Sequence, residues 1–194
     1  MQCHIRFSMP TRIISALTIL TTVLVVGQAC NSQRLLPKIP LPRELTIQLG
    51  KTATVAVFLS TKCPMYLQYP LTLKSLSKKF SEHGISFIGV FPEQNSDQFA
   101  SKKFMRKYAL PFSIIIDRNH KITKALGATI TPEVFVLDSI GNIYYRGMID
   151  NWYYGLGKKH PNQTIHYVED CLKALSKQLP APHVSTKPLG CFIN

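Results

Sequence analysis

The sequence contains few acidic residues, and this shortage makes the chain strongly basic. Among 194 residues, 10 are Asp or Glu and 23 are Lys or Arg, so the formal net charge is +13. The lysines form no continuous run and are spaced as in Lys74, Lys78, Lys79, Lys102 and Lys103. Such spacing is typical of solvated helix faces. Despite the charge, we therefore expect no nucleic-acid partner.

Cysteines are also few, and their spacing excludes the common zinc-binding motifs. The chain has five cysteines, and no two of them have the short spacing of a zinc finger. The histidines show no metal-ligand spacing either. The sequence therefore predicts neither a metal site nor a cofactor. Beyond residue 30, Cys63, Cys171 and Cys191 remain, and an oxidising compartment would allow one disulfide among them.

Long hydrophobic runs are absent except near the N-terminus. The run from Ile13 to Val26 is uncharged and apolar, but it is shorter than the roughly 20 residues of a membrane-spanning helix. Arg6 and Arg12 precede this run and small residues follow it, which is the pattern of a secretory signal peptide. We expect residues 1–29 to be a signal peptide, with an uncleaved membrane anchor as the alternative.

Cys30 follows this segment directly and leaves two forms of the exported protein open. Cleavage before Cys30 by an ordinary signal peptidase gives a soluble periplasmic protein. Lipidation of Cys30 gives a lipoprotein, although Gly27 and Gln28 replace the usual aliphatic and small residues of the lipidation motif. In both cases we expect a protein of the bacterial cell envelope that touches the membrane only through its N-terminus.

Beyond the leader, strand and helix patterns alternate. Residues 30–44 are rich in proline and are predicted to be an extended linker. Apolar runs predict strands at 53–59, 85–91, 112–117, 134–137 and 143–145. Helical periodicity predicts helices at 95–108, 121–126 and 164–179, and one that opens at Pro64 and ends before Gly84. This order indicates an α/β fold, a central mixed β-sheet flanked by helices on both faces, over residues 45–180. We expect an irregular C-terminal tail, 181–194, that carries Cys191.

Cys63 lies where an apolar strand gives way to a helix, a place that favours thiol chemistry. Pro64 suits the first helical position, where no N–H is needed. The Cys63 sulfur then faces the unpaired N–H groups and the positive end of the helix dipole, and Lys62 adds a neighbouring positive charge. These features favour the thiolate, which is the nucleophilic form. We interpret Cys63 as a functional thiol; the alternative is a small apolar residue at a strand end.

Three parts of the sequence form a recognisable set: VAVFLSTKCPMY, ATITPEVFVLDSIGNIYYRG and the closing helix. They resemble the thioredoxin-like fold and, within it, the redoxin branch of AhpC/TSA proteins and membrane-tethered TlpA-like reductases. The resemblance covers about residues 45–180. The resemblance implies that Cys63 is the attacking cysteine. It also implies that Thr131-Pro132 is the loop whose cis-proline faces the sulfur and whose backbone pairs with an extended substrate segment. Exported bacterial redoxin-domain proteins are also similar at RGMIDNWYYGLGKK and at Gly190-Cys191.

The sequence departs from this family at the residues that complete the chemistry. Tyr66 stands where a dithiol reductase has its second, resolving cysteine. Ala56 and Ser60 replace the proline and the threonine of the peroxiredoxin motif, although Ser60 still offers a hydroxyl to the thiol. Neither activity of the family therefore transfers to Cys63 unaltered.

A second thiol has to come from elsewhere in the chain. Cys171 lies on the apolar stripe of the last predicted helix, so we expect it to pack in the core. Cys191 lies in a tail rich in proline and glycine, which has an extended reach of roughly 3.3 Å per residue. We take Cys191 as the candidate that resolves a mixed disulfide or a sulfenic acid on Cys63. A structural disulfide or a free tail thiol is the alternative.

Three functions remain open. The first is an exported thiol–disulfide oxidoreductase, in which Cys63 attacks a disulfide of a partner protein and an external thiol reductant recycles it. The second is a thiol peroxidase, in which peroxide oxidises Cys63. The third is a non-catalytic thioredoxin-like lipoprotein that binds a protein or binds copper through the soft ligands Cys63, Met65 and Cys191.

Overall fold

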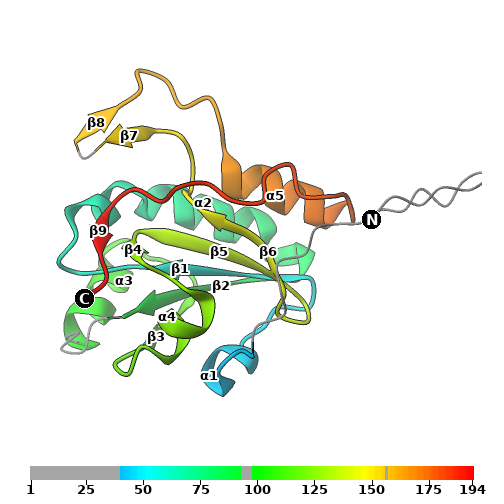
Figure 1. The fold of residues 1–194 in the computed structure, drawn as a ribbon, viewed down its shortest axis with the longest axis horizontal. Coiled ribbons are helices and arrows are strands. Elements are labelled where there is room, and N and C mark those ends of the chain that lie inside the picture. The colour runs from blue at the N-terminus through cyan, green and yellow to red at the C-terminus, as the bar shows by residue number, and fades with distance from the viewer. Residues whose placement is uncertain (1–39, 93–97, 156) are drawn as a thin grey trace, which may run out of the picture. The chain divides into compact units, whose positions relative to one another are not determined.

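A five-stranded mixed sheet forms the centre of the fold (Figure 1). The computed structural model describes residues 40–92, 98–155 and 157–194. The strands are β1 (Ala53–Phe58), β2 (Ile85–Phe91), β3 (Ser113–Ile116), β5 (Glu133–Asp138) and β6 (Ile143–Gly147), in the order β3-β2-β1-β5-β6. Strands β1, β2 and β3 are parallel, β5 is antiparallel to β1, and β6 is antiparallel to β5. The predicted α/β fold with a mixed sheet is confirmed.

In the described residues, helices precede, connect and follow these strands. They are α1 (Arg43–Thr46), α2 (Pro70–Phe80), α3 (Gln98–Lys107), α4 (Lys121–Leu126) and α5 (Tyr167–Ser176), with the 3₁₀ helices η1 (Pro64–Gln68) and η2 (Ser81–His83) on either side of α2. Gly84 follows η2 with a φ of 71°, and Gly127 follows α4 with a φ of 68°. This left-handed conformation favours glycine at helix ends, which is why both helix ends could be predicted.

Helices cover both faces of the sheet, so β1 is buried along its whole length. Successive side chains of a strand point to opposite faces. Val55 and Val57 belong to a core shared with α2, α3 and α5. Ala56 and Phe58 belong to a second core shared with α1 and α4. The end of β1, where Cys63 follows, is thus fixed between two packed layers.

Two short strand pairs lie outside the central sheet. Strand β4 (Ile130–Thr131) pairs antiparallel with β9 (Cys191–Phe192), and β7 (Tyr153–Gly155) pairs antiparallel with β8 (Lys158–Lys159). Figure 1 shows β9 next to β4 near the C-terminus. The tail, expected to be irregular, therefore contains a strand. Strands of two or three residues are too short to show the alternation that predicts longer ones.

The N-terminal predictions fall mainly outside the described residues. This holds for the leader, 1–29, for Cys30 and for most of the linker, 30–44. From Arg43 the chain is helical and not extended, and Leu45 of α1 is fully buried. Helix α1 thus begins at Arg43, two residues before the predicted start of the domain at residue 45, and Leu45 packs into the core. Among the described residues, no helix has both the length and the apolar character needed to cross a membrane.

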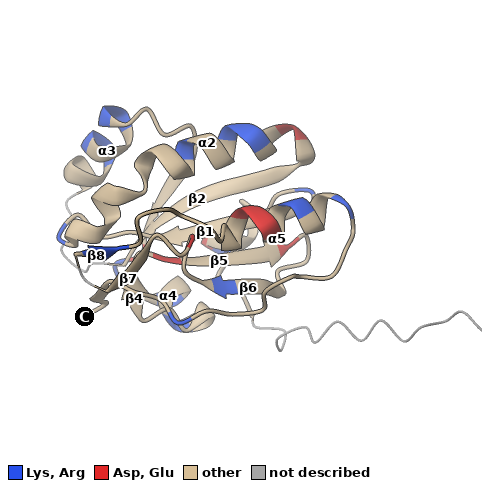
Figure 2. Cartoon of the chain, turned by 90° about the horizontal axis from the view of Figure 1, so that it is seen from above, with Lys and Arg blue, Asp and Glu red and all other residues tan. Residues whose placement is uncertain are grey.

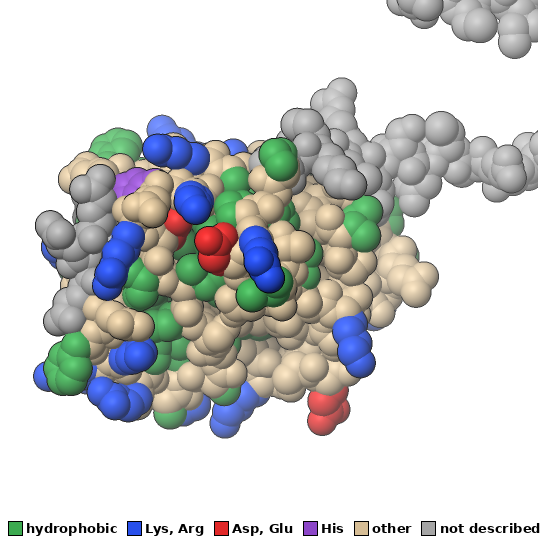
Figure 3. Space-filling view, turned by 90° about the horizontal axis from the view of Figure 1, so that it is seen from below, with side chains coloured by type: hydrophobic (Ala, Val, Ile, Leu, Met, Phe, Trp, Pro, Cys, Tyr) green, Lys and Arg blue, Asp and Glu red, His purple; other side chains and the backbone are tan. Residues whose placement is uncertain are grey.

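The basic residues are dispersed over the described surface. Figure 2 shows Lys and Arg on α2, α3, α5 and several other segments. In Figure 3, which shows the opposite side, basic side chains are likewise separated by hydrophobic and other groups. In neither view are the basic residues gathered into one continuous stripe.

Candidate active site around Cys63

Cys63 lies after β1, at the start of η1, and only 1% of it is exposed. Its backbone is extended, with φ −91° and ψ 116°, and Pro64 takes the first helical position, as predicted. The helix that opens here is a short 3₁₀ helix, and α2 begins separately at Pro70. Pro70 has no N–H for a continuous α-helix; the N–H of Tyr69 donates to the carbonyl of Tyr66 instead, at 3.4 Å. The predicted single helix is thus divided in two.

The loop of β4 faces the Cys63 thiol. The Thr131–Pro132 peptide bond is cis. The Cys63 Sγ donates a hydrogen bond to the carbonyl oxygen of Thr131 at 3.0 Å, across 68 residues of sequence. Thr131 itself is 1% exposed. The structure therefore brings together the thiol and the proline loop that the sequence singles out.

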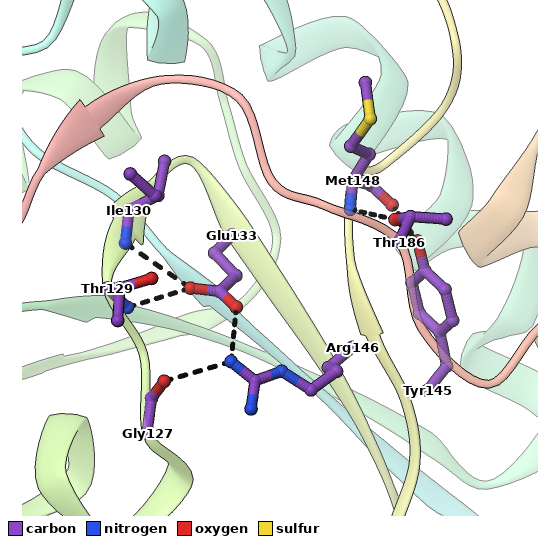
Figure 4. A network of polar contacts seen from close by, with 8 residues as sticks. All are labelled: Gly127, Thr129, Ile130, Glu133, Tyr145, Arg146, Met148 and Thr186. Carbon is purple, nitrogen blue, oxygen red and sulfur yellow. Dashed lines mark hydrogen bonds and ion pairs between the residues drawn. The ribbon is translucent and has the colours of Figure 1, made fainter.

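A buried carboxylate holds this loop in shape. Glu133 is fully buried, and its Oε2 accepts hydrogen bonds from the N–H groups of Thr129 at 2.9 Å and Ile130 at 3.4 Å. Its Oε1 forms an ion pair with Arg146 of β6 at 3.1 Å (Figure 4). A buried charge needs such partners, because its removal from water is costly. The pair therefore ties the loop before the cis-proline to the central sheet.

Sequence reasoning missed both members of this pair. Arg146 also donates to the carbonyl of Gly127 at 3.0 Å, so it joins β6 to the end of α4 (Figure 4). One signal was present in the sequence: Glu133 is a charged residue directly after Pro132, and the four residues that follow it are apolar. A charge in such a place demands a partner, but the pattern does not say which one.

The C-terminal tail brings Cys191 next to Thr131 and Cys63. Cys191 is the register partner of Thr131 in the β4–β9 pair, and the Thr131 hydroxyl donates to the Cys191 carbonyl at 3.4 Å. Burial and a hydrogen bond with Cys63 raise the pKa of the Cys191 thiol to about 11. Both cysteines are free thiols. The two thiols thus lie side by side without a disulfide.

Gly190 permits this close approach of the tail. A Cβ at this position would overlap with the carbonyl oxygen of Thr131 and would lie 3.0 Å from Cγ2 of Ile130. The requirement for glycine arises from lack of space, since Gly190 does not have a positive φ. The Gly190-Cys191 pair therefore fits the β4 edge closely.

Thr186 fastens the preceding part of the tail to β6. The N–H of Thr186 donates to the carbonyl of Arg146 at 3.0 Å, and the N–H of Arg146 donates to the carbonyl of Val184 at 3.2 Å. The Thr186 Oγ1 lies 2.7 Å from the Tyr145 hydroxyl and accepts a bond from the N–H of Met148 at 2.8 Å (Figure 4). The tail is thus held at two points, on β6 and on β4.

The residues predicted to support the thiolate shape the turn or are exposed. The Ser60 hydroxyl accepts a hydrogen bond from the N–H of Lys62 at 3.1 Å, and the Ser60 carbonyl accepts one from the N–H of Cys63 at 3.3 Å. Lys62 and Pro64 are exposed. Ser60 therefore acts on the backbone that presents Cys63.

Cys171 and Tyr66 pack against the core. Cys171 is fully buried, its Sγ lies 3.6 Å from the carbonyl of His183, and burial raises its pKa to about 12. The prediction that Cys171 packs in the core is confirmed. The ring of Tyr66 packs on Phe104, with 4.5 Å between centroids. Within the described part of the chain, no group of three His, Cys, Asp or Glu residues is placed to hold a metal ion.

Comparison with known proteins identifies relatives of this fold. A family model described as Redoxin matches residues 34–151. No curated protein matches the chain. An uncharacterized conserved protein from Geobacillus kaustophilus is 25% identical, with a TM-score of 0.65 over 76% of this chain and 79% of that one. A hypothetical protein from Sinorhizobium meliloti 1021 is 20% identical, with a TM-score of 0.68 over 77% and 82% of the two chains. The predicted thioredoxin-like fold is confirmed.

Proposed function

Because the chain belongs to the Redoxin family, we propose that it is a thiol–disulfide oxidoreductase in which Cys63 is the nucleophile and Cys191 the second thiol. One observation carries this proposal. Cys191 pairs with Thr131, whose carbonyl oxygen accepts the hydrogen bond of the Cys63 thiol. A redoxin domain that lacks a second cysteine in η1 thus obtains one from its tail.

The exchange proceeds in two steps. The Cys63 thiolate attacks one sulfur of a disulfide in a partner protein; a new S–S bond forms, the old one breaks, and the second substrate sulfur leaves as a thiolate that takes up a proton. Cys191 then gives up its proton and attacks the Cys63 sulfur, which releases the first substrate cysteine. Two electrons have passed to the substrate, and the protein holds a Cys63–Cys191 disulfide. An external thiol reductant restores both thiols.

The pKa of Cys191 fits this order of events. At about 11, raised by burial and by the hydrogen bond with Cys63, it keeps Cys191 protonated at neutral pH. A protonated thiol is a poor nucleophile. Cys191 therefore does not compete for the substrate in the resting protein. It acts only on the mixed disulfide that forms at Cys63.

The site of action in this proposal is the bacterial cell envelope. Residues 1–29 have the pattern of a signal peptide, and Cys30 is the candidate lipidation site. Disulfides persist in such oxidising compartments. A Cys63–Cys191 disulfide would accumulate there and would make the protein dependent on its external reductant.

Peroxide reduction is a second candidate, favoured by the burial of Cys63. With the tail docked, Cys63 is 1% exposed, which admits a small oxidant more readily than a protein. The Cys63 thiolate would take one peroxide oxygen to give a sulfenic acid, and hydroxide would leave; condensation with the Cys191 thiol would then give the disulfide and water. Oxidation of Cys63 by peroxide much faster than oxidation of glutathione supports this candidate, and equal rates exclude it.

Insulin reduction in the presence of dithiothreitol tests the main proposal. We expect activity in the wild-type chain and in Cys171→Ala, and none in Cys63→Ser. Mass spectrometry of the air-oxidised, unreduced protein should show Cys63 linked to Cys191. Full activity in Cys63→Ser would remove the claim for the nucleophile. If Cys63 and Cys191 are found only in separate, unlinked species under every oxidising condition, Cys191 is not the second thiol.

A further inference from the structure

The tail segment from Gly190 to Ile193 lies on the edge of β4 as an added strand. It is antiparallel to β4, with Cys191 opposite Thr131. The N–H of Ile193 donates to the carbonyl of Thr129 at 3.0 Å, which extends the ladder by one residue. Main-chain bonds of this kind allow an extended segment of any sequence to bind a strand edge. Selection among segments therefore has to come from side chains.

Chemistry fixes the register of such a segment. A cysteine that exchanges with Cys63 has to stand opposite Thr131, because this position brings a sulfur to Cys63. The residue before that cysteine then takes the place of Gly190. There a Cβ would overlap with the Thr131 carbonyl oxygen and crowd Cγ2 of Ile130. In the reduced protein that a substrate segment meets, the hydrogen bond from the Cys63 thiol holds this carbonyl in place.

The position after the cysteine imposes no comparable limit. Phe192 occupies it in the tail, and 79% of this side chain is exposed. A large side chain at this position points into solvent. The geometric restriction thus falls on the residue before the cysteine and not on the residue after it.

Resting on the proposed function, we propose that the Ile130–Thr131 edge selects extended protein segments in which glycine directly precedes the reacting cysteine. The tail segment from Gly190 to Ile193 occupies this edge as an internal copy of such a segment. The tail and the substrate segment then bind alternately to the same Ile130–Thr131 edge. Return of the tail brings Cys191 to the mixed disulfide on Cys63 and displaces the substrate segment in the same movement.

Two synthetic peptides test the selection. They are identical except for Gly or Ala before a single cysteine, which carries 2-nitro-5-thiobenzoate as a mixed disulfide. Attack by Cys63 on the peptide sulfur releases the coloured thiolate, and its absorbance gives the rate. With the reduced full-length chain, we expect the Gly-Cys peptide to react about tenfold faster or more, the effect of a steric overlap in a packed site. Dithiothreitol, which has no binding edge, should react equally with both.

A change in the tail itself tests the competition. Gly190→Ala places a Cβ against Thr131 and should free the edge, so that attack on the Gly-Cys peptide becomes about tenfold faster. The later release of the peptide by Cys191 should become slower. Gly155→Ala is the matched control, since the atoms nearest to its Cβ belong to the Lys158 side chain, at 3.4 Å or more. Both rates should equal those of the wild type.

The outcomes separate this inference from the proposed function. Equal rates for the Gly-Cys and Ala-Cys peptides, each still lost in Cys63→Ser, overturn the selection and leave the oxidoreductase intact. Unchanged rates in Gly190→Ala overturn the role of the tail as an internal copy. Release of the coloured thiolate that does not depend on Cys63 overturns the proposed function and this inference with it.

Discussion

Thr131 and Cys191 are register partners in an antiparallel strand pair although 60 residues separate them in the sequence. Thr131 contacts both cysteines: its carbonyl accepts the hydrogen bond of the Cys63 thiol, and its hydroxyl donates to the backbone of Cys191. A single residue thus sets the relative position of the two thiols.

Removal of the second thiol should trap the substrate. In Cys191→Ser, Cys63 still attacks a disulfide, but the tail carries no sulfur to complete the exchange. We expect a mixed disulfide between Cys63 and a protein substrate such as oxidised insulin to accumulate, visible as a reducible adduct on a non-reducing gel. Cys171→Ala, which changes only a core cysteine, should show no adduct. Equal amounts of adduct in the wild type and in Cys191→Ser would contradict the role of Cys191.

The buried Glu133–Arg146 pair and the exposed Lys79–Glu169 pair should differ sharply in their effect on stability. Arg146→Gln leaves the fully buried carboxylate of Glu133 without its cation, and we expect a loss of about 3 kcal/mol in the free energy of unfolding. Lys79→Gln removes a pair whose lysine side chain is 54% exposed and whose acid, Glu169, keeps Lys173 at 3.1 Å. Its loss should stay below about 1 kcal/mol. Urea unfolding of both variants at neutral pH measures the difference, and equal losses would argue against a structural role for the Glu133–Arg146 pair.

The fold itself was largely readable from the sequence, whereas the completed site was not. Strand Ile85–Phe91 and helix Lys121–Leu126 agree with their predicted bounds, because Gly84 precedes the apolar run of the strand and Gly127 ends the helix. Glu133 and Arg146 meet only because β5 and β6 pair in a particular register. The docking of Cys191 rests on a two-residue strand with no periodicity. Contacts between distant segments depend on packing, which local patterns do not encode.

Alkaline pH should destabilise the protein through Cys171. Burial raises the pKa of this thiol from 9.0 to about 12, so above pH 9.0 the unfolded chain loses a proton that the folded chain keeps. The free energy of unfolding therefore falls as pH rises through this window. At about 1.4 kcal/mol per pKa unit, the fall reaches about 4 kcal/mol.

Cys171→Ala isolates this contribution. Burial raises the pKa of Tyr144 to about 12 and also raises the pKa of Tyr145. Both tyrosines therefore lower the stability of wild type and variant in the same pH range. Because the charge of Cys171 also raises the pKa of both tyrosines, the difference between wild type and variant reports the cysteine together with its coupling to them. Urea unfolding at a series of pH values above 9.0 measures it. Parallel stability curves for the two proteins would show that folding does not raise the pKa of Cys171.

Asp150 should have the same kind of effect on stability as Cys171, but on the acidic side. This residue is 1% exposed, accepts hydrogen bonds from Trp152 and Tyr69, and has no partner for its Oδ2 among the described residues. Burial raises its pKa above 3.8. The folded chain therefore binds a proton that the unfolded chain releases, and stability falls as pH rises from 3.8 through the folded pKa.

Asp150→Asn cannot ionise and should flatten this part of the stability curve. The asparagine oxygen can still accept the bonds from Trp152 and Tyr69. Urea midpoints measured from pH 3.8 up to neutrality should decline less in the variant than in the wild type. A decline of the same size in both proteins would place the acid-sensitive group elsewhere.

The anchor at Thr186 has a kinetic consequence. Only Lys187, Pro188 and Leu189 separate it from Gly190, so the end of the tail can leave β4 while its base stays bound to β6. A short tether of this kind keeps the attached group at an effective concentration in the millimolar range. The second thiol would then reach Cys63 in a first-order step, and dilution of the protein would not slow it. Dissolved thiols would have to be present at similar concentrations to intercept the mixed disulfide.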